Sequence, residues 1–225
     1  AIMNVSPLIS DDDAEDAALT ARSLGAELLI VRTDPLDEPE FRRNPRDRCY
    51  LCKRIILGSI AAAARERGID TVIDGSHADD LDEDRPGRRA LRELGIRSPL
   101  QEAGLAKDEV RRLARKLSVP SADRPSSPCL VTRMPFGREI TEEALRMVGE
   151  AERYLKGLGF INVRVRHHGT VARIEVLADD IASIVSMRDE IVKGLKRLGF
   201  VYITLDLQGF RSGSMSEALD DWAGA

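Results

Sequence analysis

The sequence has 225 residues, 43% of them hydrophobic and 32% charged, and its formal net charge is −4. This length suits one large or two small domains with a buried core, and the composition excludes a disordered or membrane-spanning chain, so we expect a cytoplasmic protein. The acidic balance and the 4% aromatic content also predict that nucleic acid is not a partner.

Predicted strands and helices alternate through the first half of the chain. Apolar runs predict strands over residues 1–5, 27–31 and 71–75. Amphipathic segments predict helices over residues 11–24, 49–67, 88–94 and 107–117, the first of them capped by Ser10. This alternation is typical of an α/β fold built on a doubly wound parallel sheet.

A smaller domain is predicted after a proline-rich segment. Four prolines, at positions 120, 125, 128 and 135, mark residues 119–137 as a linker or an ordered active-site loop. The elements expected downstream are a helix over 141–158, a hairpin of strands over 162–166 and 171–176, a helix over 179–198 and a strand over 201–205. We therefore expect two domains, residues 1–137 and residues 138–225, and the second is expected to be α+β.

Three cysteines are an odd number in a chain that shows no secretion signal, which argues against a disulfide framework. Cys49 and Cys52 stand one turn apart at the start of a predicted helix, in a segment rich in arginine. Positive neighbours and a helix N-terminus both favour the thiolate form, which binds metals and acts as a nucleophile. Taken alone, this pair leaves a redox dithiol and half of a zinc site as alternatives.

Cys129 adds a third thiol in a loop that prolines stiffen, residues 125–129. Three thiolates without a fourth suit a [4Fe-4S] cluster in which one iron has no protein ligand. Such an iron can bind an exogenous sulfide, which would then be a transferable sulfur. Zinc held by the three cysteines and either a water molecule or His77 is the competing interpretation.

Two arginines indicate where a phosphorylated ligand would bind. Arg164 and Arg166 alternate on one predicted strand, so both side chains point to the same face and together suit a phosphate. Glu152, on the preceding predicted helix, is placed to fix one of these arginines. The alternative is a solvated ladder of charges on an exposed strand.

Two aspartates are associated with the predicted strand over residues 71–75. Asp74 lies at its carboxyl end and Asp80 lies in the acidic loop that follows. Magnesium ions and nucleotide hydroxyl groups often bind at such positions. The neighbouring acids Asp79, Asp82 and Glu83 are interpreted as solvated loop residues.

Five motifs, in order along the chain, together resemble the LarE family. They are Asn44–Lys53 (NPRDRCYLCK), Asp74–Gly75 with Asp84–Gly87 (DG and DRPG), Pro128–Gly137 (PCLVTRMPFG), Arg164–Arg166 (RVR) and Thr204–Gly213 (TLDLQGFRSG). LarE proteins are ATP-dependent sulfur transferases of nickel-pincer cofactor biosynthesis, within the PP-loop ATP pyrophosphatase superfamily. The resemblance spans nearly the whole chain and implies that residues 1–137 are part of a PP-loop domain.

The resemblance implies a reaction on a small nucleotide, pyridinium-3,5-biscarboxylic acid mononucleotide. ATP, with Mg²⁺, adenylates a ring carboxylate, and AMP leaves as sulfur arrives, which yields a thiocarboxylate. Some family members consume a single cysteine as the sulfur source, whereas others carry three cysteines that hold a [4Fe-4S] cluster. Because all three cysteines are present here, the chain resembles the cluster-dependent type, which takes sulfur from a sulfide source.

The same match implies roles for individual residues. Cys129, Cys49 and Cys52 would hold the cluster and deliver sulfur. The other implied positions are the substrate-binding residues Arg164, Arg166, Glu152 and Arg133, the last beside the adenylate, and the nucleotide-binding residues Asp74, Gly75, Asp80 and Lys53. The family also implies a homo-oligomer.

The sequence departs from the family in one respect. The family's phosphate-binding loop, Ser-Gly-Gly-x-Asp-Ser after the first strand, does not occur in it, and the sequence begins at the family's second strand. We expect either a segment upstream of Ala1 or a separate polypeptide to supply this loop, whose backbone N–H groups bind pyrophosphate. A non-catalytic subunit that needs the loop from a partner is therefore one alternative function, and a cluster-dependent tRNA thiolase is another.

Overall fold

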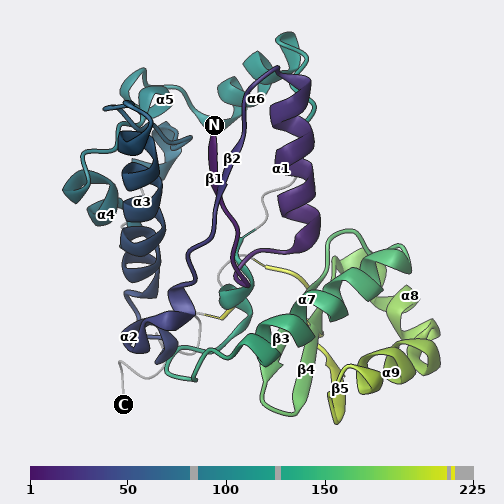
Figure 1. Ribbon diagram of the computed structural model, residues 1–225. Coiled ribbons are helices and arrows are strands. Elements are labelled where there is room, and N and C mark those ends of the chain that lie inside the picture. The colour runs from purple at the N-terminus through teal and green to yellow at the C-terminus, as the bar shows by residue number, and fades with distance from the viewer. Residues whose placement is uncertain (82–85, 125–127, 212–213, 216–225) are drawn as a thin grey trace. The chain divides into compact units, whose positions relative to one another are not determined.

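The computed structural model describes residues 1–81, 86–124, 128–211 and 214–215 (Figure 1). Parts of the predicted motifs, including Asp82, Glu83, Pro125 and residues 212–213, lie outside the described residues. The chain divides into two compact units, Ala1–Ser127 and Pro128–Ala225. None of the helices in the described ranges combines the length and the apolar character needed to cross a membrane.

The first unit contains a parallel pair of strands joined by a helix. β1 (Ile2–Asn4) pairs with β2 (Leu29–Val31), and α1 (Asp11–Ser23) connects them. The helix begins where the sequence predicts, because Ser10 Oγ accepts a hydrogen bond from the backbone N of Asp13 at 3.2 Å. It ends before Gly25, whose φ of 65° is a conformation that favours glycine.

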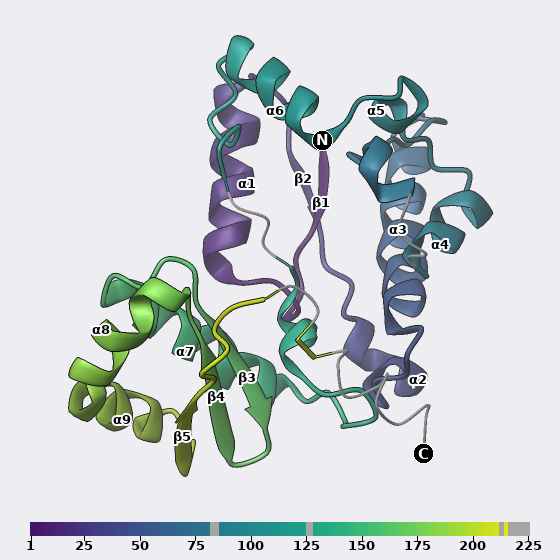
Figure 2. The ribbon, with the colours of Figure 1, turned by 180° about the vertical axis from the view of Figure 1, so that it is seen from behind.

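Helices make up much of the rest of the first unit. They are η1 (Pro35–Asp37), α2 (Pro39–Arg42), α3 (Arg48–Glu66), η2 (Ala78–Leu81), α4 (Gly87–Glu93), α5 (Pro99–Glu102) and α6 (Lys107–Lys116). The helices predicted over 49–67, 88–94 and 107–117 are thereby confirmed as α3, α4 and α6. In both Figure 1 and Figure 2, the β1–β2 pair lies between α1 and α3.

The strand predicted over residues 71–75 is the main difference in the first unit. The structure has a single parallel bridge here, between Ile73 and Arg97, with a backbone hydrogen bond from Asp74 N to the Arg97 carbonyl at 2.9 Å. Ile73 remains 62% exposed. The segment has the apolar composition of a strand, but a ladder needs a neighbouring strand along its length. The unit is therefore mixed α/β with parallel strands, and a doubly wound sheet stays a prediction.

The second unit is an α+β layer, as predicted. Its elements are η3 (Leu130–Arg133), α7 (Glu142–Gly157), β3 (Arg164–His168), β4 (Val171–Glu175), η4 (Ala178–Asp180), α8 (Ile181–Ser186), α9 (Arg188–Arg197) and β5 (Tyr202–Leu205). Within the described residues the strands form a sheet in the order β3-β4-β5, antiparallel between β3 and β4 and parallel between β4 and β5. The helix predicted over 179–198 is interrupted at Met187, which separates α8 from α9.

Alternation along the strands gives this sheet an apolar face and a polar face. Val165 and Ile174 belong to the apolar face and are 0% and 1% exposed. They pack in one core with Leu155 of α7 and Leu195 of α9, both fully buried. The alternate positions of β3 and β4 carry arginines and a glutamate, so the polar face of the sheet is where the candidate site lies.

The boundary between the units precedes Cys129, so residues 128–137 fold with the second unit. Leu130 and Val131 of η3 are buried, and Arg133 forms an ion pair with Glu152 of α7. The prolines of this segment are typical of a linker, but these long-range contacts attach it to α7. The predicted boundary after residue 137 therefore differs from the structural one after residue 127.

Candidate functional site

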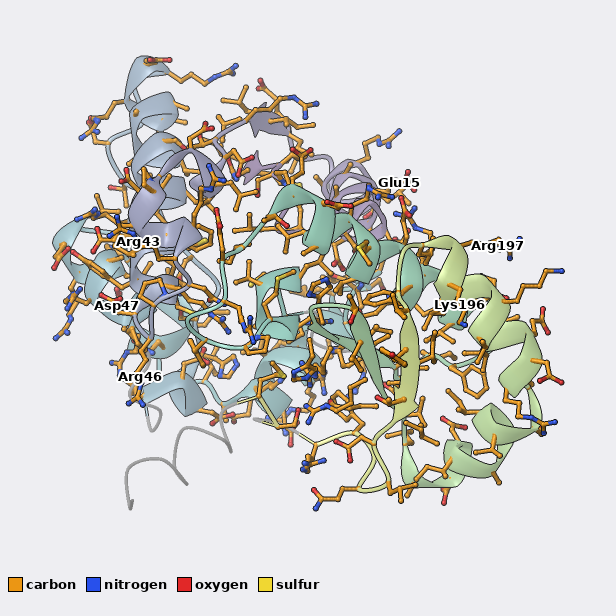
Figure 3. All side chains as sticks on the ribbon, turned by 90° about the horizontal axis from the view of Figure 1, so that it is seen from below. Glu15, Arg43, Arg46, Asp47, Lys196 and Arg197 are labelled. Carbon is orange, nitrogen blue, oxygen red and sulfur yellow. The ribbon has the colours of Figure 1, made fainter. Side chains whose placement is uncertain are left out.

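Cys49 and Cys52 lie near the start of α3, in the first unit. Cys49 is exposed and Cys52 is half-buried, and neither forms a disulfide. Arg43 and Arg46 belong to the arginine-rich segment before α3; both are exposed and lie beside this end of the helix in Figure 3. Positive charge at a helix N-terminus stabilises a thiolate. The local environment therefore fits a pair of thiols that bind metal or sulfur.

Tyr50, between the two cysteines, is buried and attaches this turn to α4. Its hydroxyl donates a hydrogen bond to Glu93 Oε2 at 2.8 Å. The guanidinium carbon of Arg89, also on α4, lies 3.4 Å from the centre of the tyrosine ring, within cation–π distance. These contacts fix the orientation of the helical turn that carries the cysteines.

Lys53 follows the cysteines and lies against Gly87 at the start of α4. A Cβ at position 87 would come within 2.7 Å of Lys53 Cδ and 3.1 Å of Lys53 Cε. Glycine therefore gives the aliphatic part of the lysine the room that it occupies. The role of Lys53 in nucleotide binding stays a prediction.

Asp74 is held by hydroxyl groups from two segments. It accepts hydrogen bonds from Ser76 Oγ and Ser98 Oγ, both at 2.6 Å, and from the backbone N of Ser76 at 3.2 Å. The bridge between Ile73 and Arg97 brings Ser98 to this position. The next residue, Gly75, is exposed, and a Cβ there would meet nothing within 4 Å. The predicted carboxylate is thus fixed beside an open stretch of backbone.

Asp80 lies in the loop after Gly75 and contacts His77. It accepts a hydrogen bond from the backbone N of His77 at 3.0 Å, and its Oδ2 lies 3.5 Å from His77 Nε2. The other ring nitrogen of His77, Nδ1, is buried and has no hydrogen-bond partner in the described part of the chain. Nowhere in the described part of the chain do three or more histidine, cysteine or acidic side chains lie where they could hold a metal ion together.

In the second unit, Arg133 and Glu152 form a buried ion pair and are 1% and 4% exposed. The guanidinium donates from Nε to Oε1 at 2.8 Å and from Nη2 to Oε2 at 2.9 Å, a bidentate arrangement. Oε1 also accepts a hydrogen bond from the backbone N of Val165 at 3.0 Å, and Arg164 Nη1 lies 4.0 Å from Oε2. Glu152 therefore connects the segment after Cys129 to strand β3.

Glu175, on β4, is a second buried carboxylate and binds two arginines. Arg166 Nη2 donates to its Oε2 at 2.6 Å, and Arg173 Nη2 donates to its Oε1 at 2.9 Å. Ser214 Oγ donates to Oε1 at 2.7 Å. The Nε atoms of Arg166 and Arg173 are buried and have no hydrogen-bond partner among the described residues. Unsatisfied guanidinium donors on one face of a sheet suit an anion such as phosphate.

Asp206 extends this network at the end of β5. Its Oδ2 lies 3.2 Å from Arg211 Nη1 and 3.7 Å from Arg173 Nη1. Burial alone would raise the pKa of Asp206, but hydrogen bonds from the backbone of Gln208 and from Arg211 lower the pKa below its usual range. The pKa of His168, on β3, is lowered by burial and by the charge of Arg173. Near neutral pH the carboxyl group of Asp206 is therefore ionised and the imidazole of His168 is neutral.

The predicted site residues divide between the two units. Cys129 is half-buried and stands directly before η3 in the second unit, whereas Cys49 and Cys52 belong to the first. Convergence of the three thiols therefore stays a prediction. The structure brings the four predicted substrate-binding residues together in the second unit; they are Arg133, Glu152, Arg164 and Arg166.

Some members of these networks carried no predicted role. No local pattern points to Ser98 or Ser214, because each meets its carboxylate only through the tertiary fold. The predicted hairpin of β3 and β4 is confirmed, and in it Arg173 lies opposite Arg166. Asp206 lies within the motif Thr204–Gly213, so that motif was the signal for it.

Comparison with known proteins finds relatives along nearly the whole chain, although no family model matches it. The chain is 41% identical over 221 residues to an uncharacterised protein of Synechocystis sp., and the aligned residues cover 97% of this chain and 82% of that protein. It is 36% identical over 219 residues to the pyridinium-3,5-bisthiocarboxylic acid mononucleotide synthase of Lactiplantibacillus plantarum, with 97% and 79% coverage. It is 32% identical over 207 residues to an uncharacterised protein of Methanocaldococcus jannaschii, with 92% and 79% coverage. Identity at this level over these lengths shows that the chain belongs to the LarE family, that of the Lactiplantibacillus plantarum synthase.

Proposed function

We propose that the chain is a sulfurtransferase that inserts sulfur into a ring carboxylate of pyridinium-3,5-biscarboxylic acid mononucleotide. The observation that carries this proposal is the 36% identity, over 97% of the chain, with a synthase whose name states the thiocarboxylate product. The polar face of the second unit supports it, because a mononucleotide substrate brings a phosphate and buried arginines suit that group.

Arg166 is the best placed of these arginines to bind the phosphate. A guanidinium has five N–H donors. Arg166 donates to the Thr132 carbonyl at 3.2 Å, to Glu175 at 2.6 Å and to Ser214 Oγ at 3.1 Å, and its Nε donor is left without a partner among the described residues. Leaving a buried donor unsatisfied costs free energy, which a phosphate oxygen would recover. Arg164, on the same face of β3, is the second phosphate ligand in this proposal.

ATP, with Mg²⁺, activates the ring carboxylate in this proposal, because a carboxylate oxygen is a poor leaving group until it is adenylated. Sulfur then attacks the acyl carbon and AMP departs. In the first unit, Lys53 supplies a cation for the ATP phosphates. Asp74, held by Ser76 and Ser98, and Asp80 supply oxygen ligands for Mg²⁺ or the ribose, beside the exposed backbone at Gly75.

Cys49, Cys52 and Cys129 are the residues that would hold a [4Fe-4S] cluster. None of the three forms a disulfide, and this and the cations beside α3 fit such a donor set. When bound, such a cluster supplies an iron without a protein ligand, which can carry exogenous sulfide. The chain's own contribution is orientation: Tyr50 and α4 fix the turn that carries the first two thiols.

The test is an anaerobic incubation of the iron- and sulfide-reconstituted protein with the mononucleotide, MgATP and sulfide. Mass spectrometry of the nucleotide and quantitation of AMP are the measurements. We expect one exchange of oxygen for sulfur per AMP formed, and no product without ATP. Cys129→Ala should form no product, whereas Arg146→Gln, in an exposed ion pair on α7, should match the parent.

Three outcomes would contradict separate parts of the proposal. Thiolated nucleotide formed without AMP would contradict adenylation. Stoichiometric zinc with no iron in the protein purified without air would contradict the cluster. A reconstituted protein that binds ATP and the nucleotide but forms no thiocarboxylate would contradict the function itself.

A further inference from the structure

The backbone on both sides of Cys129 is hydrogen-bonded to one side chain, that of Arg133. Arg133 Nη1 donates to the carbonyl of Pro128 at 2.9 Å and to the carbonyl of Cys129 at 3.3 Å. The first carbonyl belongs to the peptide plane before Cys129 and the second to the plane after it. Because planar peptides leave φ and ψ as the only soft backbone angles, fixing both planes fixes the direction of the Cys129 Cα–Cβ bond.

Thr132 reinforces this arrangement. The Cys129 carbonyl also accepts hydrogen bonds from Thr132 Oγ1 at 2.8 Å and from the Thr132 backbone N at 3.1 Å. Thr132 Oγ1 in turn accepts one from Arg133 Nη1 at 2.7 Å. Only rotation about χ1 is left to direct the cysteine sulfur.

The other edge of the Arg133 guanidinium is fixed to the core of the second unit. Its Nε and Nη2 are both bonded to Glu152, so every nitrogen of the guanidinium has a partner within this unit. Glu152 Oε1 also accepts the backbone N–H of Val165, in β3. The next residue of that strand, Arg166, donates from Nη1 to the Thr132 carbonyl at 3.2 Å. The strand of the candidate phosphate site and the backbone of Cys129 are thus parts of one hydrogen-bonded frame.

We infer that Arg133 and Glu152 are positioning residues that fix Cys129 relative to β3, and that Arg133 does not touch the substrate. The resemblance to the family implied a substrate contact for Arg133, but its guanidinium is 1% exposed and every nitrogen in it is already bonded. The consequence for catalysis rests on the proposed function. Sulfur transfer needs the sulfur and the acyl carbon in near-attack geometry, so a shift of Cys129 against the phosphate-bound nucleotide slows the reaction.

Kinetics separate positioning from substrate binding. A lost positioning contact lowers kcat, by about ten- to a hundredfold for a displacement near 1 Å, and leaves KM for the mononucleotide close to that of the parent. A lost substrate contact would instead raise KM. We expect Arg133→Lys, which keeps the charge but not the planar fork, to show the first pattern.

A second measurement does not depend on activity. Cys49→Ser/Cys52→Ser leaves Cys129 as the only thiol in the chain, so the rate of alkylation by iodoacetamide reports on that residue alone. Adding Arg133→Met/Glu152→Leu removes the guanidinium bonds without leaving a lone buried charge, so this variant should fold. We expect Cys129, half-buried in the parent, to be alkylated several times faster. Arg146→Gln, on the exposed face of α7, is the matched control and should not change the rate.

Low urea concentrations distinguish local release of Cys129 from general destabilisation. If the pair acts only through global stability, alkylation will accelerate with urea at the slope of global unfolding; local release predicts a rate nearly independent of urea.

A folded double variant with the parental alkylation rate and parental kcat would overturn the inference, and so would unchanged kcat with raised KM in Arg133→Lys. Faster alkylation in a protein whose parent transfers no sulfur would support positioning and refute the proposed function.

Discussion

Arg166 and Arg173 lie directly opposite each other on β3 and β4, and the carboxylate of Glu175 binds both guanidinium groups. Like charges at facing positions of neighbouring strands repel. Glu175 is 0% exposed, so water screens its charge little, and its attraction for both guanidinium groups offsets the repulsion between them. The pair of arginines therefore depends on one buried acid.

Glu175→Gln should strongly destabilise the second unit, because it leaves two guanidinium groups without their shared counter-charge. We expect the free energy of unfolding to fall by about 3–5 kcal/mol, measured by urea denaturation. Glu150→Gln, in the exposed pair with Arg146, is the control and should change it by less than about 1 kcal/mol. Equal stability of Glu175→Gln and the parent would show that the arginines do not need this charge.

Two glycine-to-alanine substitutions should act in opposite directions. At Gly194 in α9, a Cβ would collide with the ring of Tyr154, so Gly194→Ala should displace the ring and lower the free energy of unfolding by about 1–3 kcal/mol. At Gly58 in α3, a Cβ would meet nothing within 4 Å, so Gly58→Ala should stabilise by about 0.5–1 kcal/mol through helix propensity. Thermal or urea unfolding measures both, and the same sign for the two variants would contradict this account.

The histidines of β3 should make the chain less stable in mild acid. Burial lowers the pKa of His167 and, with the charge of Arg173, the pKa of His168. Between these lowered values and the unfolded value of about 6.5, the unfolded chain binds more protons than the folded one, so the free energy of unfolding falls as pH falls. His167→Gln/His168→Gln should flatten this part of the curve of unfolding free energy against pH. Superimposable curves for parent and variant would count against it.

Gly87→Ala should act on Lys53 rather than on stability. The added methyl group would collide with the aliphatic part of Lys53, which is flexible, so we expect the fold to persist and the ammonium group to move. If Lys53 binds ATP phosphates, Gly87→Ala raises KM for ATP. Lys53→Met should raise it as well, and combining the two should add little because both act through one side chain. If the two substitutions raise KM for ATP additively, Gly87→Ala does not act through Lys53.

Local signals in the sequence predicted the long helices well. Ser10 caps α1 as expected, and Thr141 caps α7 in the same way, since a hydroxyl that accepts from the first free N–H groups of a helix needs only neighbouring residues. The short helices α2 and α5 were not predicted. They begin at Pro39 and Pro99, because proline at the first helical position gives up no helical hydrogen bond.

Strand ends depended on pairing. The predicted turn over residues 167–170 is shorter in the structure, where β3 continues through His168 opposite Val171 and only Gly169 and Thr170 make the turn. The same dependence explains why residues 71–75 do not form the predicted strand: within the described chain only Ile73 pairs, in one bridge with Arg97. Backbone hydrogen bonds between strands come from distant segments, which no local pattern specifies.

The sequence by itself determined which reactive groups are available: three thiols, the arginines of β3, and the carboxylates of Asp74 and Asp80. Its motifs also indicated the family. Only the tertiary structure decided how each charged group is used. Arg133 and Arg166 are both buried, yet every guanidinium nitrogen of Arg133 is hydrogen-bonded, whereas Nε of Arg166 has no partner in the part of the chain that the structure describes. The partners of both arginines come from distant parts of the chain, since Glu152 is 19 residues from Arg133 and Ser214 is 48 residues from Arg166. Burial and partnership are properties of the packed chain, because they depend on which distant segments exclude water together.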